Sequence, residues 1–103
     1  MPKIFTYLNF IFFFFSNEHE PIHVHVQKGE YQSVFELILD DGKLSTINIR
    51  DKEGYDPLPV KDIVVVEKFI EYYHKDIVQK WVDFFVLKKK VTCTNITTKK
   101  IEK

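Results

Sequence analysis

This chain of 103 residues has a single cysteine, Cys93. A single cysteine excludes a disulfide framework and any cysteine-rich zinc module, and it favours a reducing compartment. Only three glycines are present, and they lie too far apart to cradle a phosphate. The longest apolar stretch, Ile4 to Phe15, contains polar residues and is shorter than the roughly 20 residues of a membrane-spanning helix. No small-x-small cleavage pattern follows it, so we expect a cytoplasmic protein with no membrane partner.

Aromatic residues and balanced charges are what the chain has in quantity. It is 45% hydrophobic and 16% aromatic, with 15 basic and 15 acidic side chains, which is enough apolar material for one core. Residues 1–87 carry 9 Lys or Arg and 14 Asp or Glu, whereas residues 88–103 carry 6 Lys and 1 Glu. We therefore predict one domain over residues 1–87 and a flexible basic tail over residues 88–103. The tail is either a solvated terminus, which we favour, or an arm that weakly binds phosphate groups or a partner.

Alternation and turn residues predict a sheet in the first half of the chain. Lys3–Tyr7 and Phe10–Ser16 are predicted to form a hairpin, with the apolar second arm as a central strand covered on both faces. Ile22–Val26, Tyr31–Leu39 and Leu44–Arg50 are the remaining strands, and a turn of the Asp-Gly type joins the last two. We therefore expect an α+β fold with an antiparallel sheet of four to five strands.

An apolar stripe with spacings of three and four residues predicts a helix from Pro59 to Leu87. Such a helix would be about 43 Å long, against a radius of gyration of about 13 Å for a domain of this size. We therefore expect a C-terminal helical hairpin or a kinked long helix packed on one face of the sheet, with the break or kink between Tyr73 and Lys75. Trp81 lies on the stripe and is expected to be a core residue.

Histidines carry the chemistry that the sequence suggests. His23 and His25 alternate with apolar residues on one predicted strand, so their side chains share the face opposite the core, about 7 Å apart. In a metal site, these two side chains would bind one divalent ion. His19, Glu18 or His74 would complete an open site that activates water.

Without a metal, His23 and His25 would act as general base and general acid, with His19 or His74 assisting. RNA cleavage through attack by the 2′-hydroxyl uses such a pair, because imidazole is available in both protonation states near neutral pH. In a third interpretation the pair is only the solvated polar face of a half-buried strand, and His74 is a polar residue at a helix junction. No cofactor is expected apart from the metal alternative, and the sequence leaves all three interpretations open.

Several segments together are typical of one family. They are an aromatic run, an Asn-Glu-His triplet, a proline, a His-x-His-Val segment, a Leu-Pro pair and a Tyr-His-Lys-Asp segment before a tryptophan: Phe12–Phe15, Asn17–His19, Pro21, His23–Val26, Leu58–Pro59, Tyr73–Asp76 and Trp81. In these segments the chain resembles the small prokaryotic family domain of unknown function 4160 (DUF4160), over residues 1 to about 87. The resemblance places the four histidines at motif positions, with Asn17 and Glu18 beside them as binding candidates, and it assigns a role to none.

The family resemblance implies a small cytosolic protein of bacteria or phages, often encoded beside a second small protein of the family domain of unknown function 2442 (DUF2442). That arrangement resembles a toxin–antitoxin pair. We therefore expect an accessory protein of a two-gene, toxin–antitoxin-like or defence-related module that binds a partner protein or nucleic acid, with or without an RNA-cleaving histidine site.

Two alternatives come from other classes of function. One is a non-catalytic binder of a small nucleotide or similar anionic ligand, held by His23, His25 and Lys28. The other is a purely structural protein-interaction module. The oligomeric state stays open, with a homodimer among the alternatives.

Overall fold

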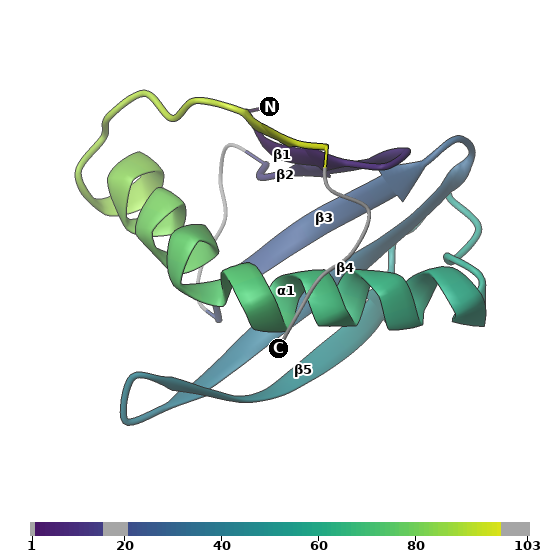
Figure 1. The fold of residues 1–103 in the computed structure, drawn as a ribbon, viewed down its shortest axis with the longest axis horizontal. Helices are drawn as coiled ribbons and strands as arrows, with labels where there is room; N and C mark the ends of the chain where they lie inside the picture. The colour runs from purple at the N-terminus through teal and green to yellow at the C-terminus, as the bar shows by residue number, and fades with distance from the viewer. Residues whose placement is uncertain (1, 16–20, 98–103) are drawn as a thin grey trace.

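One mixed sheet with a long helix across one of its faces forms the fold (Figure 1). The computed structural model describes residues 2–15 and 21–97. The strand order is β5-β4-β3-β2-β1-β6. The elements are β1 (Lys3–Tyr7), β2 (Phe10–Phe13), β3 (His23–Lys28), β4 (Tyr31–Asp40), β5 (Lys43–Asp51), helix α1 (Val60–Trp81), a π-helical turn η1 (Val82–Val86) and β6 (Thr94–Ile96). The α+β class is confirmed, whereas an antiparallel sheet of four to five strands is wrong, because the described residues form a sheet of six strands that is mixed.

The first five strands form an antiparallel meander. Two residues separate β1 from β2, β3 from β4 and β4 from β5, whereas residues 14–22 lie between β2 and β3. In the β4–β5 turn, Asp41 and Gly42 both have positive φ angles, of 55° and 78°. This backbone matches the right-handed twist of the flanking strands. The Asp-Gly sequence therefore determines the register of the longest hairpin in the sheet, and the apolar β2 becomes a central strand as expected.

The sixth strand comes from the stretch expected to be a flexible tail. Residues Thr94–Ile96 pair in parallel with β1. Thr6 of β1 donates a hydrogen bond to the side-chain oxygen of Asn95 at 2.6 Å, and these two residues are 89 positions apart in the sequence. Lys80 joins this strand to the helix: its Nζ donates to the carbonyl of Ile4 at 3.1 Å and to Thr94 Oγ1 at 3.0 Å. Burial lowers the pKa of Lys80, and nearby Cys93 opposes this shift.

Helix α1 is one continuous helix over its 22 residues, so of the two alternatives the helical hairpin is wrong and one long helix is confirmed. Figure 1 shows the helix axis changing direction along its length, and this bend occurs without a break in the helix. The hydrogen bonding changes only after Trp81, where the π-helical turn begins and Leu87 donates its N–H to the carbonyl of Val82. The bend brings the second half of the helix around the end of the sheet.

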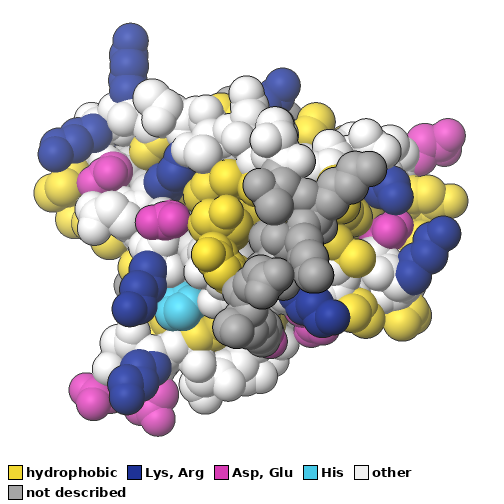
Figure 2. Space-filling model, viewed as in Figure 1, with side chains coloured by type: hydrophobic (Ala, Val, Ile, Leu, Met, Phe, Trp, Pro, Cys, Tyr) yellow, Lys and Arg dark blue, Asp and Glu magenta, His cyan; other side chains and the backbone are white. Residues whose placement is uncertain are grey.

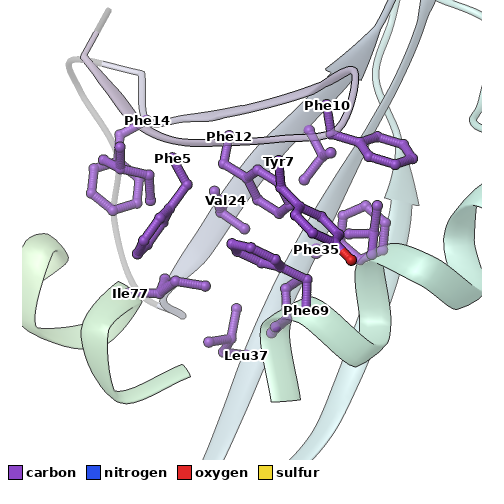
Figure 3. Close-up of a cluster of buried hydrophobic side chains, with 14 of the residues drawn as sticks. Phe5, Tyr7, Phe10, Phe12, Phe14, Val24, Phe35, Leu37, Phe69 and Ile77 are labelled. Carbon is purple, nitrogen blue, oxygen red and sulfur yellow. The ribbon is translucent and has the colours of Figure 1, made fainter. Parts of the chain in front are cut away.

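The core lies between the sheet and α1, with Phe69 at its centre (Figure 3). The Phe69 ring stacks on Phe12 at a centroid distance of 4.5 Å and meets Phe5 edge-on at 5.4 Å. Val24 and Val26 of β3 face the same layer and are completely buried, as the alternation predicted. Each such side chain contributes about 1.5–3 kcal/mol when it is removed from water. Within the described residues, no helix combines the length and the apolarity needed to cross a membrane.

Candidate functional site

The two histidines of β3 share one face of the sheet, and their ring centroids lie 5.6 Å apart. They are not solvated: His23 is 6% exposed and His25 is 4% exposed. The interpretation of the pair as a solvated strand face is therefore wrong. The physical reason is that both faces of the central strands are covered, one by the helix and the other by aromatic side chains.

Aromatic rings surround the pair. The His25 ring stacks on Phe15 at 4.0 Å and on Phe13 at 5.4 Å. The His23 ring contacts Trp81, near the bent end of the helix, at 5.4 Å. Trp81 is itself 3% exposed, which confirms it as a core residue. Rings from β2, the segment after it and α1 thus enclose imidazoles that the sequence alone shows only as alternating polar residues.

Hydrogen bonds determine the tautomer of His23. Its Nδ1 lies 2.8 Å from the carbonyl oxygen of Pro21, and a carbonyl oxygen can only accept, so this nitrogen carries the proton. His25 Nδ1 lies 3.3 Å from the side-chain oxygen of Gln32, in the same donor arrangement. Gln32 in turn donates to Gln27, and Gln27 donates to the carbonyl of Gly29. A chain of hydrogen bonds therefore leads from buried His25 to the β3–β4 turn.

This geometry holds both imidazoles in place within the fold. A general acid and base must lie within hydrogen-bond distance of the reacting atoms, and here only 4–6% of each histidine is exposed. Both Nδ1 atoms serve as donors to protein oxygens, and these hydrogen bonds fix the orientation of the two rings. The arrangement orders the start of β3 against β2, β4 and the helix.

His74 lies elsewhere. It sits on α1, where its Nδ1 is 2.8 Å from the carbonyl of Glu71, and it lines an open groove of about 680 Å³ between the helix and β5. The structure thus brings His23 and His25 together and places His74 outside their ring cluster. Asn17, Glu18 and His19 lie outside the described residues. Among the described residues, no three His, Cys, Asp or Glu side chains are grouped as a metal site would require.

Lys28 faces the opposite side of the sheet from the histidines, because it continues the alternation of Val24 and Val26. Its Nζ lies 3.3 Å from Asp62 Oδ1, near the start of α1, and 5.3 Å from the centroid of the Phe10 ring. The lysine therefore connects the end of β3 to the helix. It does not join His23 and His25 as an anion-binding group.

The groove beside β5 is the concave surface that sequence reasoning missed. One wall consists of Lys43 to Ile47 of β5, and the other consists of polar residues of α1: Glu67, Glu71, His74 and Lys75. Leu44 and Ile47 are half-buried between these walls. The local signal for this site is the uncharged run 44–49 in an alternating strand. This run predicts a binding groove only if β5 is an edge strand, and the order of strands in a sheet is a property of the whole fold.

Comparison with known proteins gives a family and no characterised relative. No curated protein and no solved structure matches the chain significantly. The sequence model of one family, described as Domain of unknown function (DUF4160), matches residues 9–82. This match covers β2 to α1, including the histidine strand and all the residues that line the groove. The chain therefore belongs to the DUF4160 family.

Proposed function

We propose that this protein is an accessory protein of a two-gene module and binds a strand of its partner protein along the outer edge of β5. The observation that carries the proposal is this edge. β5 is a nine-residue strand at the end of the sheet order, and no other described strand pairs with its outer side. A long edge strand presents a row of backbone donors and acceptors that a strand from another chain can satisfy.

The side chains of β5 support pairing. Thr46 to Ile49 are uncharged, and Ile49 is 37% exposed. Natural edge strands are commonly protected by charges and bulges. In β5 the register shifts between the partners of Ile38 and Leu39, so Ser45 is the extra residue of a bulge. Charged side chains occur only toward the ends of the strand. The segment from Thr46 onward keeps a regular register with β4 and is the part suited to a partner strand.

The groove explains how such a partner would be selected. A strand added to β5 points alternate side chains toward the helix face, where Leu44 and Ile47 form an apolar floor. Polar and charged side chains of α1 line its far wall. An apolar centre with a polar rim is typical of protein interfaces. We infer that the partner strand alternates apolar side chains, which enter the groove, with solvent-facing polar ones.

The buried histidine pair supports a binding function over the RNA-cleaving alternative, because His23 and His25 have structural contacts on their rings and Nδ1 atoms. The family resemblance suggests the partner, a small DUF2442-type protein encoded next to this one. Both the module and the partner are proposals, and the edge of β5 is the surface through which we expect them to act.

Co-expression tests this function. The protein would be co-expressed with the DUF2442-type protein of the same genome, and we expect the two to purify together. The double variant Thr46→Lys/Ile49→Lys adds two charges to the edge and should weaken the complex at least about tenfold, since charged side chains block edge pairing. Val60→Lys/Val64→Lys adds the same charges on exposed positions of α1 and serves as the matched control. The proposal would be contradicted if the two proteins did not purify together, or if the edge variant bound the partner as tightly as the control variant does.

A further inference from the structure

The end of the long helix has three unusual features in nine residues, 82–90. The first is the π-helical turn Val82–Val86, a rare geometry that is frequent at functional sites. The second is Lys88, which has a φ of 57°, in the left-handed region that glycine usually occupies after a helix. The third is a run of three exposed lysines, Lys88 to Lys90. The proposed partner-binding function uses none of them.

Two phenylalanines form a corner at this point. The rings of Phe84 and Phe85 meet edge-on, at a centroid distance of 4.7 Å and an interplanar angle of 81°. Phe85 packs on Trp81 at 4.3 Å, so the corner is anchored to the core. Both phenylalanines are only half-buried. The end of the helix therefore presents two aromatic rings that are partly open to solvent and nearly perpendicular to each other.

The three lysines lie around this corner. After the left-handed residue Lys88, the N–H of Lys89 returns to the carbonyl of Asp83 at 2.8 Å. Phe84, Phe85 and the three lysines together line a cavity of about 370 Å³. None of the three ammonium groups forms an ion pair with a carboxylate of residues 2–15 or 21–97. Figure 2 shows basic and hydrophobic side chains, with an acidic one among them, at the upper left, over the end of the helix in Figure 1.

From this arrangement we propose that the five residues, the Lys–Phe tip, bind single-stranded nucleic acid. Ammonium groups neutralise phosphates without reading sequence, and aromatic rings stack on bases of any kind. In this proposal a flat base stacks on the exposed part of one ring, with its edge toward the other ring. Residues 1–87 carry more acidic than basic side chains, so we expect weak, sequence-independent binding that is centred on this tip.

Fluorescence anisotropy with a labelled oligouridine of about 12 nucleotides tests the proposal on the full chain. Three phosphate contacts predict that log K falls against log salt with a slope of about −2. The variant Lys88→Gln/Lys89→Gln/Lys90→Gln should lose most of this slope and bind at least about tenfold more weakly at low salt. Phe84→Leu should weaken binding about fivefold or more while keeping the slope, because it removes a stacking surface and no charge.

A matched charge control separates the tip from the total charge. Lys3, Lys61 and Lys68 are exposed at other places on the surface. Changing all three to Gln removes three positive charges, as many as the tip variant loses. This control should bind as the unmodified protein does. Circular dichroism melts confirm that each variant is folded. Absence of binding by the unmodified protein at low salt would overturn the proposal, and so would equal losses in the two triple variants. Binding to phosphatidylglycerol vesicles in place of RNA would assign the tip to anionic membranes instead.

Discussion

The imidazole of His25 stacks on the ring of Phe15 at a centroid distance of 4.0 Å and an interplanar angle of 20°. Phe13 lies against the same imidazole at 5.4 Å, and Lys52 Nζ lies 4.7 Å from the Phe15 centroid. Residues that alternate as polar positions on a strand are thereby buried. The His-x-His segment of this family member contributes to a second, aromatic layer on the sheet face opposite α1.

A stability measurement tests whether the contacts of His25 stabilise the fold. His25→Ala leaves a cavity beside Phe15 and removes the donor to Gln32, so the free energy of unfolding should fall by about 2–4 kcal/mol. Urea denaturation measures this change. His74→Ala is the control, since its ring is only half-buried in the groove, and its effect should stay within about 0.5 kcal/mol. Equal and small losses in both variants would show that the aromatic contacts of His25 contribute little.

Alkaline pH should destabilise the protein through Tyr73. Burial, with the nearby Tyr72 and Asp76, raises the pKa of Tyr73 above its usual 10.0. As the pH rises through 10.0, the unfolded chain loses this proton before the folded protein does, so the free energy of unfolding falls until the folded pKa is passed. Tyr73→Phe should remove this part of the fall. Urea denaturation over about pH 8 to 11 compares the two proteins, and identical alkaline slopes would contradict the assignment.

Lys80 should hold the C-terminal strand in place. Its ammonium group donates to Ile4, Thr92 and Thr94, and its pKa is lowered because this position is partly buried. Lys80→Met keeps the apolar stem and removes these bonds. We expect faster proteolysis within residues 88–97 and a loss of about 1 kcal/mol in the free energy of unfolding, since solvent discounts a half-exposed contact.

The exposed Lys75 provides the control for Lys80. Lys75→Met changes the same residue type on the same helix, away from β6, and should leave the rate of proteolysis unchanged. The pH dependence of stability that arises from Lys80 has the opposite sign to that from Tyr73. Between the lowered pKa of Lys80 in the folded protein and 10.5, the folded protein releases this proton before the unfolded chain does, so the contribution of Lys80 to the free energy of unfolding rises with pH. Proteolysis that is equally fast in both variants would show that the backbone pairing of β6 holds without Lys80.

Local patterns predicted the elements better than their arrangement. The apolar run of β2, the alternation of β3 and the Asp41-Gly42 turn are encoded in neighbouring residues, and the structure confirms them. The pairing of β6 with β1 joins residues almost a whole chain apart, and the polar sequence Thr94-Asn95-Ile96 carries no strong strand signal. Its place in the sheet follows from long-range contacts with Lys80 and Thr6.

The candidate site shows the same division. The sequence correctly grouped His23 with His25, because strand alternation is local, but the burial of the pair depends on rings from Phe15 and from Trp81. Those rings arrive from the segment after β2 and from the end of α1. The groove at β5 depends further on strand order, which no local pattern specifies.

Hydrogen exchange at the edge of β5 tests the central claim most directly. Amide exchange would be followed by mass spectrometry in the protein alone and in its complex with the DUF2442-type protein. We predict that Thr46 to Asp51 become protected in the complex, because the outward N–H groups of the edge strand gain partners, while β3 changes little. Unchanged exchange along β5 in a stable complex would contradict partner binding through this edge.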